Sequence, residues 1–386
     1  MSQVEERFDG EWPNTVNEKL VADWLRHAHQ IERVSSAEAR KIEEFLKLEV
    51  LPDVMGRLVS RLERIKSRGY DSGIDTTTRW RDLMDGVMQI VDEGISQAAK
   101  ANIAAMRDVA KYEAKWQAAT LEKRIGEAVG DVVSVNLTLP DPARLRALVT
   151  ERPIAGHNVG EWWDKLTVDT AGRIEREVRI GLAEGQSVPD IARRIRGDAQ
   201  TLDGGVFQIT NRHAQAISRN AAIHASNQAR QEVYRDNPDW VAKEVWVATL
   251  DTRTCPKCGA LDGKEFAVGE GPMPPAHPPG PSGGACRCSR APVTRSINDV
   301  LREKGLKPRF KEVTNRMRAS MDGLVPRSTT YGDWLKTLDS EQLDEALGAS
   351  RASAFKAGDL SVERMVDQSG RILNLSELAK REGIEF

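Results

Sequence analysis

All four cysteines of this chain of 386 residues lie between positions 255 and 288, with one histidine between them. Cys255 and Cys258 form a Cys-x2-Cys pair, His277 follows, and Cys286 and Cys288 form a Cys-x-Cys pair. Thiolate and imidazole groups are preferred zinc ligands, and a Cys-x2-Cys knuckle presents two thiolates with little strain. The pattern predicts a structural zinc site with five candidate ligands for four positions. The first pair are the firmest candidates, one cysteine of the second pair joins them, and His277 or the remaining cysteine completes the tetrahedron.

The segments around the cysteines indicate a small β unit. Residues 244–249, rich in valine and tryptophan, and residues 264–268 have strand-like sequences. Between them, Leu261-Asp-Gly-Lys264 contains the Asp-Gly pair that favours a tight turn. The proline-rich segment that carries His277 cannot form a helix. We therefore predict that the first cysteine pair lies beside a short β-hairpin, with His277 on an extended loop.

Helical patterns dominate the rest of the chain. Apolar residues recur at helical spacing from Met84 to Trp116, and residues 1 to about 130 are expected to form long helices arranged as a hairpin or arm. Two prolines in Leu139-Pro-Asp-Pro142 indicate a boundary. Further helices are expected over 161–183, 188–196 and 210–235. The predicted fold class is mainly α with a small zinc-stapled β-hairpin unit (α+β), with long N-terminal helices, a helical core and a C-terminal helical extension.

The chain is expected to divide into three parts. They are an N-terminal helical arm over 1–138, a domain with the cysteine-rich hairpin over 139–295, and a basic linker with a helical extension over 296–386. The helix over 210–235 carries His213 and His224. These histidines are about three turns apart and cannot share one metal ion, so we expect each to be solvated or to cap a helix.

Charge is unevenly distributed along the chain. The net charge is -2, but residues 287–327 contain eleven basic and four acidic side chains. This run is where a polyanion such as double-stranded DNA would bind without sequence specificity. The residues expected to contact it are Arg287, Arg290, Arg295, Lys307, Arg309 and Lys311. The alternative is a solvated linker whose bases pair with acids elsewhere.

No apolar run approaches the roughly 20 residues needed to span a membrane. The N-terminal residues have acids where a signal peptide would have an apolar segment. The protein is therefore expected to be made in the cytoplasm and to have no membrane partner. In a reducing compartment the cysteines are expected to be metal ligands and not disulfides.

The order of motifs resembles the phage head-morphogenesis family, the Mu-type minor head proteins. The motifs are a helix, a tryptophan-bearing strand, Asp251-x-Arg-Thr-Cys-x-x-Cys, Leu261-Asp-Gly, Pro-x-x-His277-Pro and Cys286-Arg-Cys. The likeness extends to the C-terminal segment, for example Tyr331-Gly-Asp-Trp-Leu. Two features depart from the family pattern. Residues 279–285 separate His277-Pro from Cys286, and Arg219-Asn-Ala replaces Arg-Thr-Glu, so a polar role tied to that acid is absent.

The resemblance implies a minor capsid protein. Such a protein associates with the portal protein and with other capsid or scaffold proteins during procapsid assembly, and it contacts packaged DNA. It is expected in the host cytoplasm during assembly and then inside the virion head near the portal. The expected role is non-catalytic, with a structural zinc.

The alternative is a zinc-dependent, nuclease-like DNA-processing enzyme. A catalytic zinc needs an open coordination position, whereas five candidate ligands predict a closed site. A zinc deaminase would need His-x-Glu before the first cysteine pair, and here His277 follows it. A sequence-specific DNA regulator would need a recognition helix beside the zinc, whereas a turn and a strand are expected after Cys258.

Overall fold

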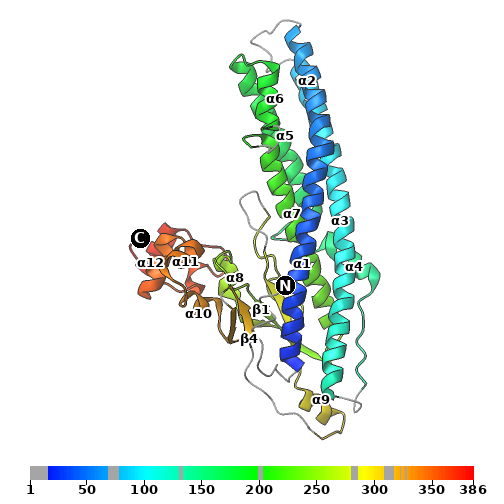
Figure 1. Cartoon of the computed structure of the whole chain (residues 1–386), viewed down its shortest axis with the longest axis vertical. Helices are drawn as coiled ribbons and strands as arrows, with labels where there is room; N and C mark the ends of the chain where they lie inside the picture. The colour runs from blue at the N-terminus through cyan, green and yellow to red at the C-terminus, as the bar shows by residue number, and fades with distance from the viewer. Residues whose placement is uncertain are drawn as a thin grey trace.

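The structure, a computed structural model, describes residues 16–67, 78–129, 134–198, 203–279, 286–307, 317–321, 323–326 and 328–386. A long helical bundle forms the body of the molecule, and a small sheet and a group of short helices lie beside one half of it (Figure 1). Within the described residues, no helix is long and apolar enough to cross a membrane. The predicted fold class, mainly α with a small β unit, is confirmed.

The N-terminal part is a helical hairpin. Helix α1 (Val16–Phe45), the π-helical turn η1 (Leu46–Val50) and α2 (Leu51–Ser67) follow one another without a break, and α3 (Thr78–Val129) runs back beside them (Figure 1). Pro52 follows the π-helical turn, in which the backbone N–H of Leu51 bonds to the carbonyl of Leu46, so the hydrogen-bond pattern of the helix changes next to the residue that cannot donate. Most apolar side chains of the hairpin face inward and are buried, with Leu48 and Met88 as exposed exceptions.

Four further helices complete the bundle: α4 (Pro142–Glu151), α5 (Val159–Ala183), α6 (Val188–Arg196) and α7 (Val206–Arg235). The first turns of α4, α5 and α6 have side-chain caps that satisfy free backbone N–H groups, whereas α7 begins after Gly205 without one. Asp141 caps α4 ahead of a proline at its first position, Asn158 forms a capping box on α5, and Ser187 caps α6. The helices predicted over 161–183, 188–196 and 210–235 correspond to α5, α6 and α7, and their observed bounds differ from the predicted ones by a few residues.

Helix α7 is the central helix of the bundle. It packs against α1, α3 and α5, and almost all of its side chains are buried. Its small residues, among them Ala214, Ala221 and Ala225, allow the neighbouring helices to approach closely. His213 and His224 are only 8% and 2% exposed, so neither is solvated. His224 instead bonds to the backbone of Arg152, the C-cap residue of α4, which agrees with the capping alternative.

The hydrophobic cores cross both predicted domain boundaries. One core extends from Ile42 to Val300 and joins α3 to α7 across the boundary at residue 138. A second core joins Leu250 and Ala260 to the C-terminal helices across the boundary at residue 295. Neither boundary is a break in packing.

The small sheet has three antiparallel strands in the order β2-β1-β3. Strand β1 (Val241–Val247) pairs with β2 (Glu265–Phe266) as the sequence predicts, and with β3 (Ser289–Thr294), which it does not. A short helix that was not predicted, α8 (Pro256–Leu261), lies between β1 and β2 and contains Cys258. The predicted turn over Leu261–Lys264 follows it, with the backbone N–H of Lys264 3.0 Å from the carbonyl of Leu261, and β2 comes next. Gly263 has a φ of 77° in the turn that follows, a conformation that glycine adopts without strain.

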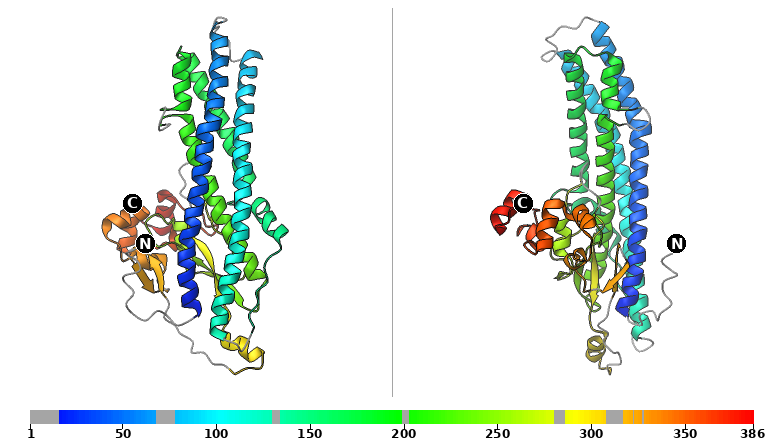
Figure 2. Two further views of the ribbon diagram at one scale, coloured as in Figure 1. Left: turned by 45° about the vertical axis from the view of Figure 1, so that its right-hand side comes forward. Right: turned by 60° about the vertical axis from the view of Figure 1, so that its left-hand side comes forward.

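The remaining elements are α9 (Ile297–Glu303), β4 (Met317–Ser320), β5 (Gly323–Pro326), α10 (Tyr331–Leu335), α11 (Ser340–Leu347), α12 (Ala349–Ala357), the 3-10 turn η4 (Glu363–Met365) and α13 (Leu375–Glu382). Strands β4 and β5 form an antiparallel pair. We call the elements from β4 to α13 the C-terminal module. Figure 2 shows the module on one side of the bundle, next to the sheet.

Candidate metal centre

Three of the four cysteines converge beside the sheet. Cys258 lies in α8, and Cys286 and Cys288 lie just before β3. The three sulfur atoms are within 4.8 Å of one another, and Cys258 Sγ is 4.0 Å from Cys286 Sγ. The three side chains are buried. This cysteine cluster (Cys258, Cys286 and Cys288) is positioned to bind a metal ion, and it is the one such group of His, Cys, Asp or Glu among the residues that the structure describes.

Cys255 and His277 lie beside the cysteine cluster. Cys255 caps α8, and its Sγ accepts a hydrogen bond from the backbone N–H of Cys258 at 3.5 Å. The contact with Cys258 lowers the pKa of Cys255 to about 6. Interaction with the side chain of Cys286 raises the pKa of His277, which lies on the irregular loop that the sequence predicts. Both cysteines of the second pair thus join Cys258, and Cys255 and His277 are the two candidates near the fourth position.

The thiols of the cluster influence one another strongly. Contacts with Cys255, Cys286 and Cys288, together with burial, raise the pKa of Cys258 well above its ordinary value. Burying several thiolates side by side is costly because their charges repel in a medium of low dielectric constant. A dication among them would offset this repulsion and favour the thiolate forms. The donor set is therefore suited to a soft or borderline divalent metal.

Two asparagines of α7 hold the second cysteine pair and the first residues of β3. Asn220 Oδ1 accepts a hydrogen bond from the backbone N–H of Cys286 at 3.3 Å. Asn227 Oδ1 accepts from Ser289 Oγ at 2.8 Å and from the backbone N–H of Arg290 at 3.0 Å. These two hydrogen-bonding positions were not predicted from the sequence. Two asparagines seven residues apart among small residues are the signal that could have revealed them, because they lie on one helix face.

The two arginine-containing motifs around the cysteines are joined by an ion pair. Arg287, between Cys286 and Cys288, binds Asp251 through both terminal nitrogens of its guanidinium, Nη1 and Nη2, with Nη2 2.8 Å from Oδ1. The Asp251 side chain also accepts a hydrogen bond from the backbone N–H of Arg253 at 3.1 Å. This bidentate pair ties the loop before α8 to the Cys-Arg-Cys segment. Arg287 was predicted to contact DNA, but in the fold its charge is balanced by Asp251.

Arg290 is fully buried and cannot contact a DNA phosphate in this fold, so the prediction for this residue is corrected. Its Nη2 lies 3.1 Å from Glu244 Oε2 and donates to the carbonyl of Glu270, while Nη1 donates to the carbonyl of Pro272. The guanidinium also lies over the ring of Phe266, 4.4 Å from its centroid. The pairing of β1 with β3 places the Arg290 side chain against Glu244 of β1 and Phe266 of β2.

The other predicted DNA contacts are dispersed. Arg295 forms an ion pair with Glu303 of α9, and Lys307 is exposed. Arg309 and Lys311 lie outside the residues that the structure describes. Within the described part of the basic run, the arginines are mostly engaged with carboxylates.

The C-terminal module is attached directly to the segment around the cysteine cluster. Asp262 accepts hydrogen bonds from the backbone N–H groups of Ala248 and Tyr331, both at 2.8 Å. Tyr331 Oη donates to the carbonyl of Thr254 at 3.0 Å. The ring of Tyr331 lies so close to Gly259 that a Cβ there would be 2.3 Å from Tyr331 Cδ1. Glycine in α8 is therefore required for this approach.

Residues 172–291 match the family model described as Phage Mu protein F like protein. The matched segment begins within α5 and ends in β3, so it includes the cysteine cluster, Cys255 and His277. The resemblance predicted from the cysteine motifs is confirmed over these residues, and it indicates a phage head-morphogenesis protein. The comparisons with curated proteins and with solved structures found no significant match.

Proposed function

We propose, from the match of residues 172–291 to the Mu protein F-like family, that the chain is a minor capsid protein that acts without catalysis. It would associate with the portal protein and other capsid or scaffold proteins during procapsid assembly in the host cytoplasm. It would remain inside the virion head near the portal and contact packaged double-stranded DNA. The observation that carries the proposal is the family match over α7, the sheet and the cysteine cluster.

The test is co-expression of the full chain with the portal protein and isolation of a complex. Deleting the N-terminal helices is unsuitable, because they share one core with α5 and α7. Exposed apolar positions on the bundle are better probes: Leu48 is 65% exposed and Val168 is 64% exposed. Leu48→Glu and Val168→Glu should keep the fold and report which side contacts a partner. Failure of the full chain to bind portal, capsid or scaffold protein would sink the proposal.

We infer that the metal is zinc and that its role is structural. Cys258, Cys286 and Cys288 would hold it together with Cys255 or His277. The ion would brace α8 against the Cys-Arg-Cys segment, and the C-terminal module contacts α8 through Tyr331. Metal analysis of the purified chain should give one zinc per chain. Cys255→Ser and His277→Gln, compared with each other, would identify the fourth ligand by loss of zinc.

A nuclease-like enzyme is the alternative function. It would need a coordination position open to substrate, whereas all three thiols of the cysteine cluster are buried. Incubation of the zinc-loaded chain with duplex and single-stranded DNA decides between the two functions. Cleavage that Cys258→Ser abolishes in a folded protein would support the enzyme.

A further inference from the structure

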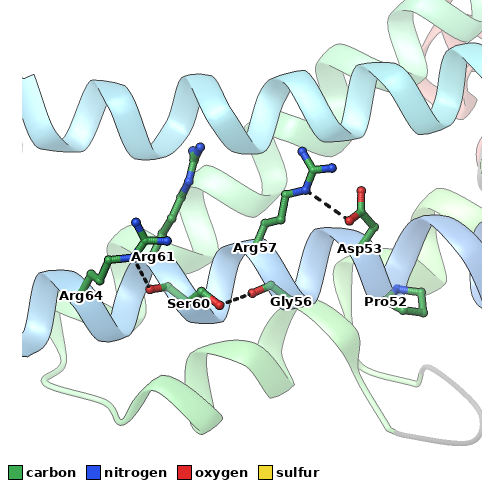
Figure 3. A pocket seen from close by; sticks show the side chains of 7 residues that line it. All are labelled: Pro52, Asp53, Gly56, Arg57, Ser60, Arg61 and Arg64. Carbon is green, nitrogen blue, oxygen red and sulfur yellow. Dashed lines mark hydrogen bonds and ion pairs between the residues drawn. The ribbon is translucent and has the colours of Figure 1, made fainter.

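The structure contains an arginine-lined groove on the outer part of the bundle, far along the chain from the predicted basic run. Seven residues of α2 line it: Pro52, Asp53, Gly56, Arg57, Ser60, Arg61 and Arg64. Its volume is about 540 Å³. Figure 3 shows the three arginines leaving the same side of α2, as their spacing of four and three residues requires. We call these seven residues the arginine groove.

Two of the three arginines are held in place by hydrogen bonds to main-chain carbonyls and not by ion pairs with described carboxylates. Arg61 Nη1 donates to the main-chain carbonyls of Asp82 and Leu83 in α3, at 3.0 and 3.3 Å. Arg64 Nε donates to the carbonyl of Ser60 at 3.2 Å. Among the described residues, no carboxylate forms an ion pair with either arginine. Their guanidinium groups are therefore oriented, and no carboxylate in the described part of the chain neutralises their positive charge.

A glycine in α3 makes the position of Arg61 possible. A Cβ at Gly86 would lie 1.4 Å from Arg61 Nη1, so any larger residue would displace this side chain. Glycine within a helix costs about 1 kcal/mol relative to alanine. A glycine at the point where Arg61 reaches α3 therefore favours a fold in which the Arg61 side chain lies against α3.

The remaining arginine has a partner that is easily exchanged. Arg57 Nε lies 3.2 Å from Asp53 Oδ1, and the two side chains are 51% and 50% exposed. Exposed pairs four residues apart on a helix contribute only about 0.3–0.5 kcal/mol, so a phosphate can replace this carboxylate. Asp53 is the one acid in the groove, which leaves three positive charges against one negative.

Other arginines of the same part of the bundle are arranged differently. Arg193 pairs with Asp190, and Arg194 pairs with Glu177 and Glu184. These arginines are balanced by carboxylates, as on an ordinary solvated helix face. The contrast identifies the arginine groove as a surface with unused affinity for an anion.

We propose that the arginine groove binds the phosphate backbone of double-stranded DNA. The proposal rests on the proposed contact with packaged DNA and names the surface that makes it. Guanidinium groups bind phosphate oxygens in a bidentate manner, which suits an oriented arginine. The groove runs along one helix, and Pro52 and Gly56 are its only apolar lining residues. It therefore offers little for the side chains of an acidic peptide, whereas a regular row of phosphates needs only charge and hydrogen-bond donors.

The experiment measures binding of the full-length, zinc-loaded chain to a fluorescent DNA duplex of arbitrary sequence over a series of salt concentrations. The variant replaces the three arginines: Arg57→Gln, Arg61→Gln and Arg64→Gln. The matched control makes the same charge change on α5: Arg173→Gln, Arg176→Gln and Arg179→Gln. Because each lost phosphate contact removes about 0.9 from the slope of log affinity against log salt, the groove variant should lose roughly two to three units of slope. Its affinity at low salt should fall about tenfold or more, and the control should change much less.

Equal behaviour of the groove variant and the control would overturn the proposal. A second variant, Arg57→Gln with Arg64→Gln, leaves the contact of Arg61 with α3 intact and guards against misfolding; it should lose about two units of slope. If a glutamate-rich peptide displaces the fluorescent duplex and unlabelled DNA does not, the groove binds an acidic protein segment. This result would also overturn the proposal. Portal binding by the groove variant is measured in parallel, so that failure of the groove is separate from failure of the proposed capsid role.

Discussion

The helical bundle and the C-terminal module bury their apolar residues in different ways. The bundle core joins α1–α7 in one continuous cluster with long helices on several sides. The module has a smaller core of short helices, and it depends on Leu250, Ala260 and the contacts of Asp262 and Tyr331 next to the cysteine cluster. Large cores stabilise a fold alone, whereas small units need a metal, a disulfide or a neighbour. The comparison therefore predicts that the metal matters for the module and not for the bundle.

The largest expected effect is loss of the metal. In Cys258→Ser/Cys286→Ser, or after chelation, α8 and the Cys-Arg-Cys segment should separate and the C-terminal module should loosen. Zinc binding supplies roughly 10 to 16 kcal/mol in isolated zinc-finger peptides, which sets the scale. Limited proteolysis should release the module, while circular dichroism should retain most of the helical signal. A metal-free chain that resists protease as the loaded chain does would contradict the comparison.

The bundle has a vulnerable point of its own. Glu113 is fully buried, and its carboxylate binds His27 Nε2 at 2.6 Å and Arg230. Burial opposes ionisation of Glu113, but Arg230 and His27 outweigh it and lower its pKa. Glu113→Gln removes the carboxylate charge beside the buried guanidinium of Arg230, and breaking a buried ion pair in this way costs about 3–5 kcal/mol.

Urea unfolding monitored by helical signal tests the Glu113 prediction. The control is Lys41→Gln, because Lys41 is 70% exposed and pairs with Glu38 on the surface. An exposed pair contributes at most about 1 kcal/mol. Equal stability losses in the two variants would show that the buried network is not important for the bundle.

The bundle should also weaken in mild acid. Burial lowers the pKa of His224 to about 4, although the backbone of Arg152 opposes this. The unfolded histidine has a pKa of about 6.5. Below pH 6.5 the unfolded state therefore takes up a proton that the folded state does not, and stability falls until the folded histidine is protonated near pH 4.

Between pH 7 and 4.5 protonation of this residue in the unfolded state should lower the free energy of unfolding by about 2–3 kcal/mol. In His224→Gln the loss over the same range should be smaller by about that amount, as measured by urea unfolding at both pH values. Other acid-sensitive groups, including the cysteine cluster, are common to both proteins and cancel. An unchanged pH dependence would show that His224 is protonated in the folded chain.

The smallest predicted effect concerns the attachment of the module. Tyr331→Phe removes the hydrogen bond to the carbonyl of Thr254 but keeps the ring against Gly259. It should cost about 1 kcal/mol and speed proteolysis of the module without changing the unfolding of the bundle. Tyr112→Phe, at a tyrosine that is 42% exposed and bonded to Gln30, is the matched control and should have little effect. A shift in bundle unfolding in Tyr331→Phe would mean that the two regions unfold as one.

Local features were predictable because neighbouring residues determine them. The predicted helix over 188–196 begins through the contact of Ser187 with Asp190, whereas Asp141 with Pro142, predicted only as a boundary, also begins a helix, α4. The spacing of the cysteines and of the surrounding motifs was sufficient to indicate the family, which the match over residues 172–291 confirms. The pairing of β1 with β2 followed from strand-like runs separated by a short segment. These signals need no knowledge of the tertiary fold.

Contacts between distant segments were decided only by the tertiary structure. Which thiols converge depends on how β3 aligns with β1, and the same alignment buries Arg290 against Glu244 and removes it from the predicted DNA surface. The central position of α7 could not be predicted from a helix with so many polar residues, because Asn220 and Arg230 find partners, Cys286 and Glu113, that are far away in the chain. The sequence determined the residue types and the local elements. The tertiary structure decided burial and partners, because charge and hydrogen-bonding capacity at one position are balanced by residues that are far away in the chain.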